Sequence, residues 1–265
     1  MNSTQQCAQT FNANAAIYDD VRPGYPEPLY QDIQALADMT AAATILEIGA
    51  GSGIATYEMA ARWNVRITAL EPGAELLHLA RKRCRQYPNI RFVQSTFEEY
   101  ETPETFDLIV AATAYHWIDP AVKLTKPAKL LKDSGVLAVF WNNYTRGDSP
   151  VFDEIDAAYI QFHPTLSDDR DGRCIIREKI QSRIDELQSS PVLRHVHHRE
   201  YTFAIRLATD SYLKLLKTFS PNAVCPPDDI APFYQEIERI LAHHGDTIMQ
   251  PILVNLEILQ KVAST

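Results

Sequence analysis

The first 145 residues alternate between short apolar runs and segments with helical periodicity. Five apolar runs have the length of a strand, namely residues 45–48, 65–70, 90–94, 106–112 and 135–141. Between them, residues 54–62 and 75–86 carry apolar side chains at helical spacing. Strands that alternate with helices form parallel sheets with right-handed crossovers and helices on both faces. The pattern therefore predicts an α/β fold.

The two ends of the chain complete this pattern. Residues 1–40 are mostly helical, and two prolines and a glycine in residues 22–26 fix a turn within them. After residue 145 the pattern predicts helices over residues 146–190, 211–219 and 230–241. It also predicts two closing strands, over residues 199–207 and 252–258. We therefore expect a Rossmann-like, seven-stranded, mostly parallel sheet with helices on both faces. A helical cover would be inserted in the C-terminal half.

Composition and charge narrow the range of partners. The chain has 265 residues and a formal net charge of −9, which disfavours a phosphate backbone as a partner, so we expect no nucleic acid. No apolar run approaches the roughly 20 residues that span a bilayer, and we expect no membrane association. The four cysteines lie far apart and the N-terminus lacks a signal sequence, so we expect a cytoplasmic protein.

Histidines offer no convincing metal site. On a strand, His195 and His197 would share one face, but no third ligand is evident in the sequence. His243 and His244 near a helix end are better explained by the helix dipole. We therefore expect no bound metal.

The loop after the first strand is the strongest chemical signal. It reads Glu47-Ile48-Gly49-Ala50-Gly51-Ser52-Gly53 and leads directly into a helix. Glycines let a backbone turn tightly and approach a ligand, and a helix N-terminus offers free N–H groups. The spacing of the glycines differs from the dinucleotide fingerprint, and the Glu47 carboxylate would repel a pyrophosphate. A cationic nucleoside such as S-adenosylmethionine suits this loop better than NAD does.

A second carboxylate strengthens this interpretation. Glu71 ends the second strand, 22 residues after Gly49, where an acidic side chain can accept hydrogen bonds from both ribose hydroxyls. The alternative is an ordinary acidic residue in a solvent-facing loop. The glycine loop beside it favours the ribose contact.

Taken together, these motifs resemble those of the class I S-adenosylmethionine-dependent methyltransferases. Residues 45–53 with Glu71 are similar to the first two motifs of that family, and residues 106–112 are similar to its fourth-strand motif. Residues 114–119 resemble the "HWFD" stretch of the trans-aconitate methyltransferase-like subgroup (methyltransferase type 11/25-like). Phe11, Tyr18 and residues 22–26 resemble the N-terminal pattern of the same subgroup.

The resemblance implies a domain layout and a set of site residues. Residues 1–40 would cover the cofactor site, 41–145 would form the cofactor-binding core, and 146–265 would supply closing strands with substrate-covering helices. The cofactor-binding residues implied are Tyr18, Arg22, Glu47, Gly49, Ala50, Gly51, Gly53, Glu71, Pro72, Thr96, Phe97, Ala112 and Thr113. Thr96 stands where the family usually has an acidic residue that meets adenine. Tyr18 and Arg22 would cap the carboxylate of the cofactor, although a packed helix and a surface turn explain them equally well.

His116 follows the fourth strand, close to where a methyl donor would lie. It could act as a base or orient the acceptor, or it could simply pack the start of a helix. We expect a methyltransferase for a small molecule, possibly for O-methylation of a carboxylate or hydroxyl, working as a monomer or homodimer. Methylation of tRNA or protein, an NAD-dependent dehydrogenase and a non-catalytic cofactor-binding protein are the alternatives.

Overall fold

The computed structural model describes residues 15–37, 39–40, 42–162, 172–223 and 225–262. Phe11, which carries part of the N-terminal resemblance, lies outside the described residues.

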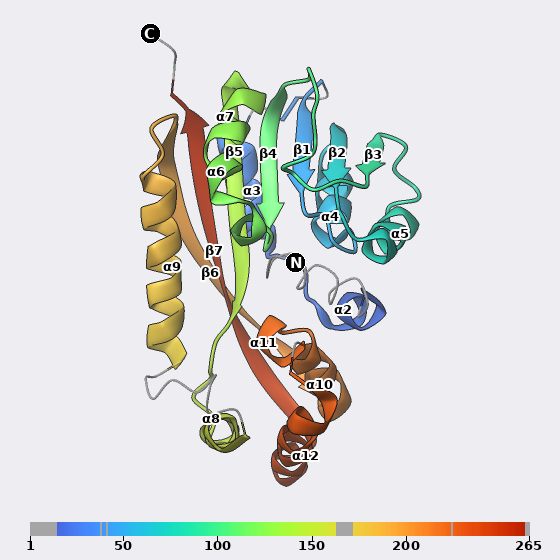
Figure 1. The fold of residues 1–265 in the computed structure, drawn as a ribbon, viewed down its shortest axis with the longest axis vertical. Helices are drawn as coiled ribbons and strands as arrows, with labels where there is room; N and C mark the ends of the chain where they lie inside the picture. Colours follow the sequence, from blue (N-terminus) through green and yellow to red (C-terminus); the bar gives the residue numbers. More distant parts are fainter. Residues whose placement is uncertain (1–14, 38, 41, 163–171, 224, 263–265) are drawn as a thin grey trace. The chain divides into compact units, whose positions relative to one another are not determined.

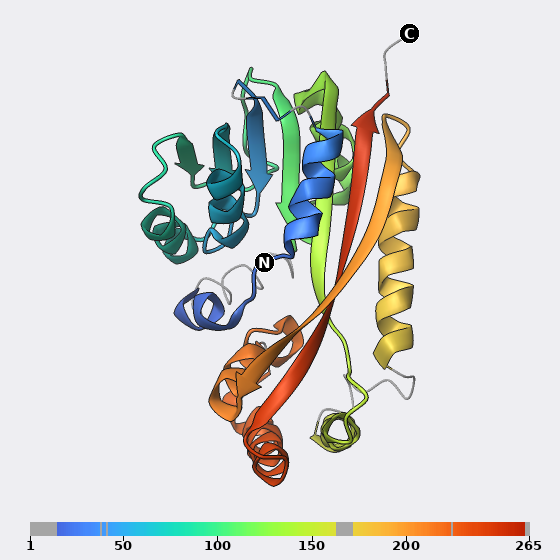
Figure 2. The same ribbon diagram turned by 180° about the vertical axis from the view of Figure 1, so that it is seen from behind.

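Seven strands form one sheet in the described part of the chain, with the order β3-β2-β1-β4-β5-β7-β6 (Figure 1). The strands are β1 (Thr44–Ile48), β2 (Arg66–Leu70), β3 (Ile90–Val93), β4 (Phe106–Ala112), β5 (Leu131–Tyr144), β6 (Leu193–Ala208) and β7 (Thr247–Lys261). β1 pairs in parallel with β2 and β4, β2 with β3, and β4 with β5. β7 runs opposite to β4 in Figure 1 and opposite to β6 in Figure 2. The predicted α/β, Rossmann-like sheet is confirmed.

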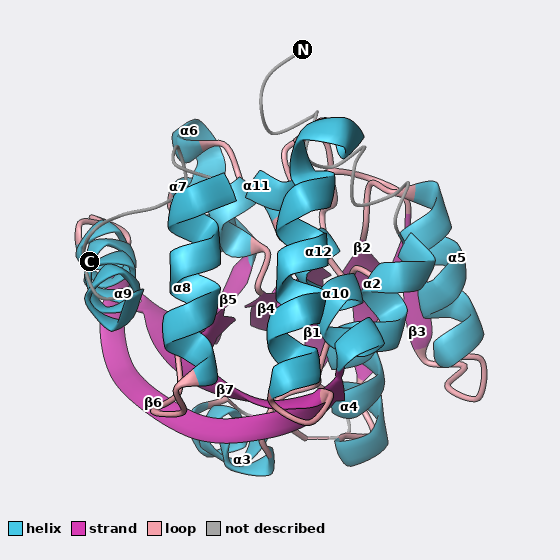
Figure 3. Cartoon of the chain, turned by 90° about the horizontal axis from the view of Figure 1, so that it is seen from below, coloured by secondary structure: helices cyan, strands magenta, loops and turns pink. Residues whose placement is uncertain are grey.

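Helices cover both faces of this sheet. The helical segments are α2 (Ala15–Val21), α3 (Glu27–Leu36), α4 (Ile54–Arg62), α5 (Ala74–Arg83), η1 (Tyr115–Trp117), α6 (Pro120–Lys123), α7 (Thr125–Leu130), α8 (Val151–Phe162), α9 (Gly172–Gln188), α10 (Thr209–Lys217), α11 (Ser220–Ala223) and α12 (Pro227–His243). Figures 1 and 2 show α3 and α4 on one face and α6 and α7 on the other, and Figure 3 again places α3 and α4 on one side of the strands. Pro26 and Pro226 precede α3 and α12, where a fixed φ suits the start of a helix.

The chain divides into two compact units that interleave along the sequence. Among the described residues, one unit takes those up to 23, those in 143–179 and those in 202–253, and the other takes those in 24–142, those in 180–201 and those from 254 onward. In the first unit α12 packs beside α8 and α10 (Figure 3) around a core of apolar side chains, which includes Phe152, Tyr212, Leu216, Phe233 and Ile237.

The second unit contains the parallel strands and their core. Side chains of β1, β4 and β5 pack with Leu187 of α9 and Leu259 of β7, and all of these are buried. Near-continuous burial along β1, β2 and β4 is what a sheet covered on both faces requires. This unit therefore holds the edge at which the parallel strands end. The predicted division into 1–40, 41–145 and 146–265 stays a prediction.

Three strands are longer than their apolar runs indicated. β5 begins at Leu131 rather than at residue 135, and its pairing with β4 is irregular there: Leu131 pairs with Phe106 and Val136 with Leu108. β6 and β7 likewise extend beyond the predicted ranges of 199–207 and 252–258. A strand persists wherever a neighbour supplies backbone partners, whether or not its side chains are apolar. Within the described residues, no helix has both the length and the apolar character needed to cross a bilayer.

Candidate functional site

The glycine loop joins β1 to α4 and adopts a backbone that glycine favours. Gly49, Gly51 and Gly53 all have positive φ, at 70°, 58° and 81°. A Cβ on Gly49 would lie 2.6 Å from the Cβ of Ala114, so the loop touches the residue that precedes η1. A Cβ on Gly51 would meet nothing within 4 Å among the described residues. The middle of the loop therefore borders open space, and its first glycine is fixed by close contact.

Glu47 is a fully buried carboxylate at the end of β1. Its Oε2 accepts a hydrogen bond from the Thr56 hydroxyl at 2.5 Å, across the first turn of α4. Its Oε1 is buried without a hydrogen-bond partner among the described residues. Burial raises the pKa of Glu47 from 4.5 to about 7, and the charge of Glu71 adds to this, whereas the Thr56 hydrogen bond opposes it. A cation placed against Oε1 would offset the cost of ionising this side chain.

Glu71 is held rigidly at the end of β2. Its Oε2 accepts from the Gly51 amide at 2.8 Å, and its Oε1 accepts from the Gly73 amide at 2.9 Å. Burial raises the pKa of Glu71, and these two backbone hydrogen bonds work in the opposite direction. The carboxylate thus joins the glycine loop to the β2 turn. Pro72 lies in this turn, and its carbonyl accepts from Gln94 at 3.3 Å.

The stretch predicted to meet adenine forms a turn after β3. The Thr96 hydroxyl accepts from the Glu99 amide at 3.2 Å, so it caps its own turn. The Phe97 side chain is 2% exposed and belongs to the core, with the Lys126 ammonium 5.3 Å from its ring centroid. The family resemblance implies that Phe97 contacts the cofactor; the structure buries its ring in the core, and the contact with the cofactor stays a prediction.

Ala112 and Thr113 end β4 in a strained turn. Thr113 has a φ of 55°, a left-handed value that is uncommon for a β-branched residue. Its amide donates to the Phe140 carbonyl at 2.7 Å, and its hydroxyl lies 3.0 Å from the Tyr25 hydroxyl. The backbone amide of Asn142 also donates to the Thr113 hydroxyl, at 3.3 Å. Sequence reasoning did not assign Tyr25 a role, and only the fold brings it to the end of β4.

His116 lies on the short helix η1, directly after β4. Its Nδ1 accepts from the indole Nε1 of Trp141 at 3.1 Å. An indole nitrogen can only donate, so neutral His116 carries its hydrogen on Nε2. Uptake of a proton at Nδ1 would require loss of this hydrogen bond. In this arrangement His116 offers a donor at Nε2, which favours orienting an acceptor over acting as a base.

Tyr18 and Arg22 lie in the unit that contains α8, α10 and α12. The Arg22 guanidinium donates to the hydroxyl and the carbonyl of Thr218, at 3.1 and 3.0 Å. It also lies over the rings of Tyr18, Tyr144 and Phe219, at 4.8 to 5.4 Å from their centroids. These contacts give Arg22 a structural role in its own unit. The predicted role of both residues at the cofactor stays a prediction.

Comparison with known proteins places this site in a family. Residues 45–135 match the family described as a methyltransferase domain. An uncharacterized methyltransferase of Schizosaccharomyces pombe is 30% identical over 135 residues, which cover 51% of this chain and 53% of that protein. A malonyl-[acyl-carrier protein] O-methyltransferase of Halalkalibacterium halodurans is 28% identical over 144 residues, covering 50% of this chain and 53% of that protein. The chain spans about half the length of these relatives.

Solved structures share the fold. An S-adenosylmethionine-dependent methyltransferase from Thiobacillus denitrificans, crystallised with S-adenosyl-L-homocysteine, superposes with a TM-score of 0.55 at 14% identity. The superposition covers 95% of this chain and 98% of that one. The matched residues 45–135 contain the glycine loop, Glu71 and the end of β4 described above. Residues 45–135 therefore match a methyltransferase domain, and the chain shares the fold of an S-adenosylmethionine-dependent methyltransferase.

Proposed function

We propose that this protein transfers a methyl group from S-adenosylmethionine to a small organic acceptor. The observation that carries the proposal is the buried Glu47 carboxylate, whose Oε1 lacks a partner among the described residues and which precedes the loop in which Gly51 borders open space. S-adenosylmethionine carries an ammonium and a sulfonium, and either cation would stabilise an ionised Glu47. The residues present therefore fit this cofactor.

Glu71 fits the ribose of the same ligand. Each of its oxygens accepts one backbone hydrogen bond, from Gly51 or Gly73, and each can accept one more. Because the two amides fix the plane of the carboxylate, a pair of vicinal hydroxyls would meet a pre-organised acceptor. Glycines at positions 49, 51 and 53, together with Ala50, would then border the amino-acid end, and Ala112 and Thr113 would border the methionine portion.

The chain's own residues mainly align the two reactants. When bound, S-adenosylmethionine supplies a methyl group on a sulfonium, which is a good leaving group. The protein then has to hold an acceptor atom in line and keep water out, and these two effects can lower a barrier by several kcal/mol. His116 would donate from Nε2 to the acceptor, because Trp141 occupies its Nδ1. A carboxylate acceptor needs no base, and this geometry suits such an acceptor.

The proposed class of methyl acceptor is supported by the net charge of the chain and by the name of one relative. A chain with a net charge of −9 is poorly suited to bind tRNA. The relative from Halalkalibacterium halodurans is named as an O-methyltransferase of a malonyl group on a carrier protein, so a carboxylate acceptor held by a protein is the second candidate. A cytoplasmic location and a monomeric or homodimeric state stay predictions.

Isothermal titration calorimetry with S-adenosylhomocysteine tests the proposal. We expect micromolar binding by the wild type and at least tenfold weaker binding by Glu71→Ala, because hydrogen bonds to a charged group contribute about 1.5–3 kcal/mol each. Glu238→Ala, which removes an exposed carboxylate on α12, is the control and should bind as the wild type does. Absence of heat with the wild type would refute the proposed function, and unchanged affinity in Glu71→Ala would refute the role of Glu71.

A further inference from the structure

The turn at the end of β4 has a backbone conformation that its own sequence disfavours. Thr113 has a φ of 55°, and the other described non-glycine residue with positive φ is Asp246. Aspartate tolerates this left-handed region, whereas a β-branched residue rarely adopts it. Such conformations persist where surrounding groups hold them, and they gather at ligand sites. Thr113 directly follows β4, at the carboxyl edge of the parallel strands, where open α/β sheets bind their ligands.

Hydrogen bonds from two directions hold Thr113 in this conformation. Its amide donates to the Phe140 carbonyl at 2.7 Å, and its hydroxyl accepts from the backbone amide of Asn142 at 3.3 Å. Both of these partners belong to β5, which pairs with β4. The Thr113 hydroxyl also lies 3.0 Å from the hydroxyl of Tyr25, which comes from the segment before α3. Tyr25 therefore supplies a contact from outside the sheet.

Tyr25 is itself fixed by its neighbours. Its ring meets the ring of Phe140 edge-on, with the centroids 4.7 Å apart. Its amide donates to Oε2 of Glu58 on α4 at 3.3 Å, and the same oxygen accepts from the Tyr30 hydroxyl at 2.5 Å. A Cβ on Gly24 would collide with the Glu58 carboxylate, so this segment packs directly on α4. The hydroxyl of Tyr25 is thus presented to Thr113 by a rigid support.

The turn at Thr113 connects this support to the glycine loop. A Cβ on Gly49 would lie 2.6 Å from the Cβ of Ala114, which is the residue after Thr113. Gly51, two residues further along the loop, borders open space among the described residues. All of these residues belong to the same compact unit as Tyr25. Because Thr113 and Ala114 are adjacent, a change in the φ of Thr113 would displace Ala114 against the loop.

The Thr113 hydroxyl keeps one position for a further hydrogen bond. A hydroxyl can donate once and accept twice. The Asn142 amide and the Tyr25 hydroxyl account for two of these three interactions, whichever of the two hydroxyls donates to the other. The third can serve a polar group of a ligand at the end of β4.

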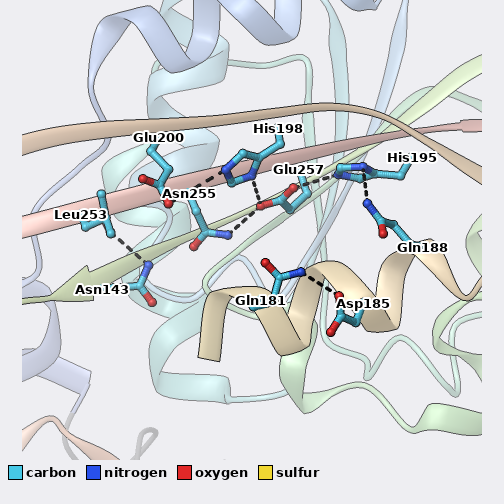
Figure 4. Close-up of polar contacts among 10 residues, drawn as sticks. All are labelled: Asn143, Gln181, Asp185, Gln188, His195, His198, Glu200, Leu253, Asn255 and Glu257. Carbon is cyan, nitrogen blue, oxygen red and sulfur yellow. Dashed lines mark hydrogen bonds and ion pairs between the residues drawn. The ribbon is translucent and has the colours of Figure 1, made fainter. Parts of the chain in front are cut away.

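A second polar cluster in the same unit is closed by its own members. Glu257 on β7 is fully buried, and its carboxylate accepts from His195 and His198, each at 2.8 Å, and from Asn255 at 3.0 Å (Figure 4). The positive charge of Arg183 on α9 is attracted by the same carboxylate. Among the residues that the structure describes, no three His, Cys, Asp or Glu side chains are arranged to hold a metal ion. This cluster therefore stabilises the sheet, and the end of β4 is the better candidate for a ligand contact.

We propose that Tyr25 is a positioning residue, whose hydroxyl holds Thr113 in its left-handed conformation at the methionine portion of the cofactor. This inference rests on the proposed function and adds a residue to the same site. Without the Tyr25 hydroxyl, Thr113 can relax toward an ordinary φ, and both its hydroxyl and Ala114 would shift. The contacts proposed for the ribose lie on β2 and its turn, and they do not depend on Thr113.

Calorimetry with two ligands tests this role. S-adenosylhomocysteine carries the amino-acid end, and adenosine lacks it but keeps the ribose and the base. Tyr25→Phe removes the hydroxyl and keeps the ring that packs on Phe140. We expect this variant to bind S-adenosylhomocysteine about threefold to tenfold more weakly, as the loss of one neutral hydrogen bond predicts, and to bind adenosine as the wild type does. A residue that merely stabilised the fold would not discriminate between the two ligands.

Tyr87→Phe is the matched control. Tyr87 is a half-buried tyrosine in the same unit and meets the ring of Tyr57 edge-on. It precedes β3 and so lies at the opposite edge of the parallel strands. This variant should bind both ligands as the wild type does.

A double-mutant cycle shows whether Tyr25 acts through Thr113. Thr113→Val removes the hydroxyl and keeps the β-branched shape, so adding Tyr25→Phe to it should cause no further loss of affinity for S-adenosylhomocysteine. Thr113→Ser keeps the hydroxyl and should bind much as the wild type does. Adding Tyr25→Phe to Thr113→Ser should weaken binding by the same factor as in the wild type.

The outcomes distinguish this inference from the proposed function. Unchanged affinity for S-adenosylhomocysteine in Tyr25→Phe, an equal loss of affinity for adenosine, or a full effect of Tyr25→Phe in the Thr113→Val background would overturn the role of Tyr25. Each of these results would leave the proposed function intact. A wild-type protein that fails to bind S-adenosylhomocysteine would remove both.

Discussion

Glu47 offers a sharp test, because its burial makes the stability of the ligand-free protein depend on pH. The carboxylate is fully buried, only Oε2 has a hydrogen-bond partner among the described residues, and its pKa is raised from 4.5 to about 7. The folded state therefore binds a proton at Glu47 more tightly than the unfolded chain does. Its contribution to stability is fully present below pH 4.5 and is lost as the pH rises through about 7.

The size of this effect follows from the two pKa values. Each tenfold change in proton affinity corresponds to about 1.4 kcal/mol, so a rise from 4.5 to about 7 corresponds to about 3 kcal/mol. Glu47→Gln keeps the shape of the side chain and cannot ionise. Its amide can donate to the Thr56 hydroxyl, so any change in hydrogen bonding is the same at every pH.

The measurement is the free energy of unfolding of wild type and Glu47→Gln, from denaturant titrations of the ligand-free proteins between pH 4.5 and 8.5. We expect the wild type to lose about 3 kcal/mol relative to the variant over this range. Glu238→Gln, an exposed carboxyl, should run parallel to the wild type. A constant difference between wild type and Glu47→Gln at every pH would refute the reasoning, because it would show that Glu47 titrates alike in both states.

Three further predictions concern the same site. At pH 6, binding of S-adenosylmethionine should release close to one proton in the wild type and none in Glu47→Gln. Calorimetry in buffers of different ionisation enthalpy measures the number of protons released. Equal release in both proteins would contradict the role of Glu47. Gly51→Ala and Gly245→Ala should each lower the free energy of unfolding by about 1–2 kcal/mol, because both glycines have positive φ. At either position the added Cβ would meet nothing within 4 Å among the described residues. Only Gly51→Ala should lose affinity for S-adenosylhomocysteine. Equal ligand affinity in the two variants would show that Gly51 does not border the cofactor. Trp141→Phe should remove the hydrogen bond to His116 Nδ1. Nitrogen NMR should then show the Nε2–H tautomer of His116 in the wild type and a mixture of tautomers in the variant. The same spectrum in both proteins would mean that the indole does not fix the tautomer.

Features built from residues close together in the chain could be predicted from the sequence, because the rules that govern them act over a few residues. The glycine loop, the apolar runs of β1, β2 and β4, and the acidic residue that ends β2 each follow from short-range rules on backbone freedom and burial. The family resemblance rests on these same residues. The fold class and the cofactor could therefore be predicted before any coordinates were known.

The sequence also indicated His116 but could not give it a role. Its tautomer depends on Trp141, which lies 25 residues away on β5. The burial of Phe97 depends on side chains from distant elements and has no local signal in the sequence, and its contact with the cofactor stays a prediction. The His195-x-His197-His198 cluster showed no third ligand in the sequence, and in the fold His195 and His198 share Glu257.

The sequence by itself determined the elements, the order in which strands and helices alternate, and the chemistry of the cofactor loop, because hydrophobic periodicity and glycine geometry act within a few residues. Only the tertiary structure decided which buried charges face one another. Arg183, Trp141 and Glu257 come from a helix and two strands far apart in the chain, and their proximity arises from sheet order and helix packing. Such pairings leave no local pattern in the sequence, because they depend on how the whole core packs.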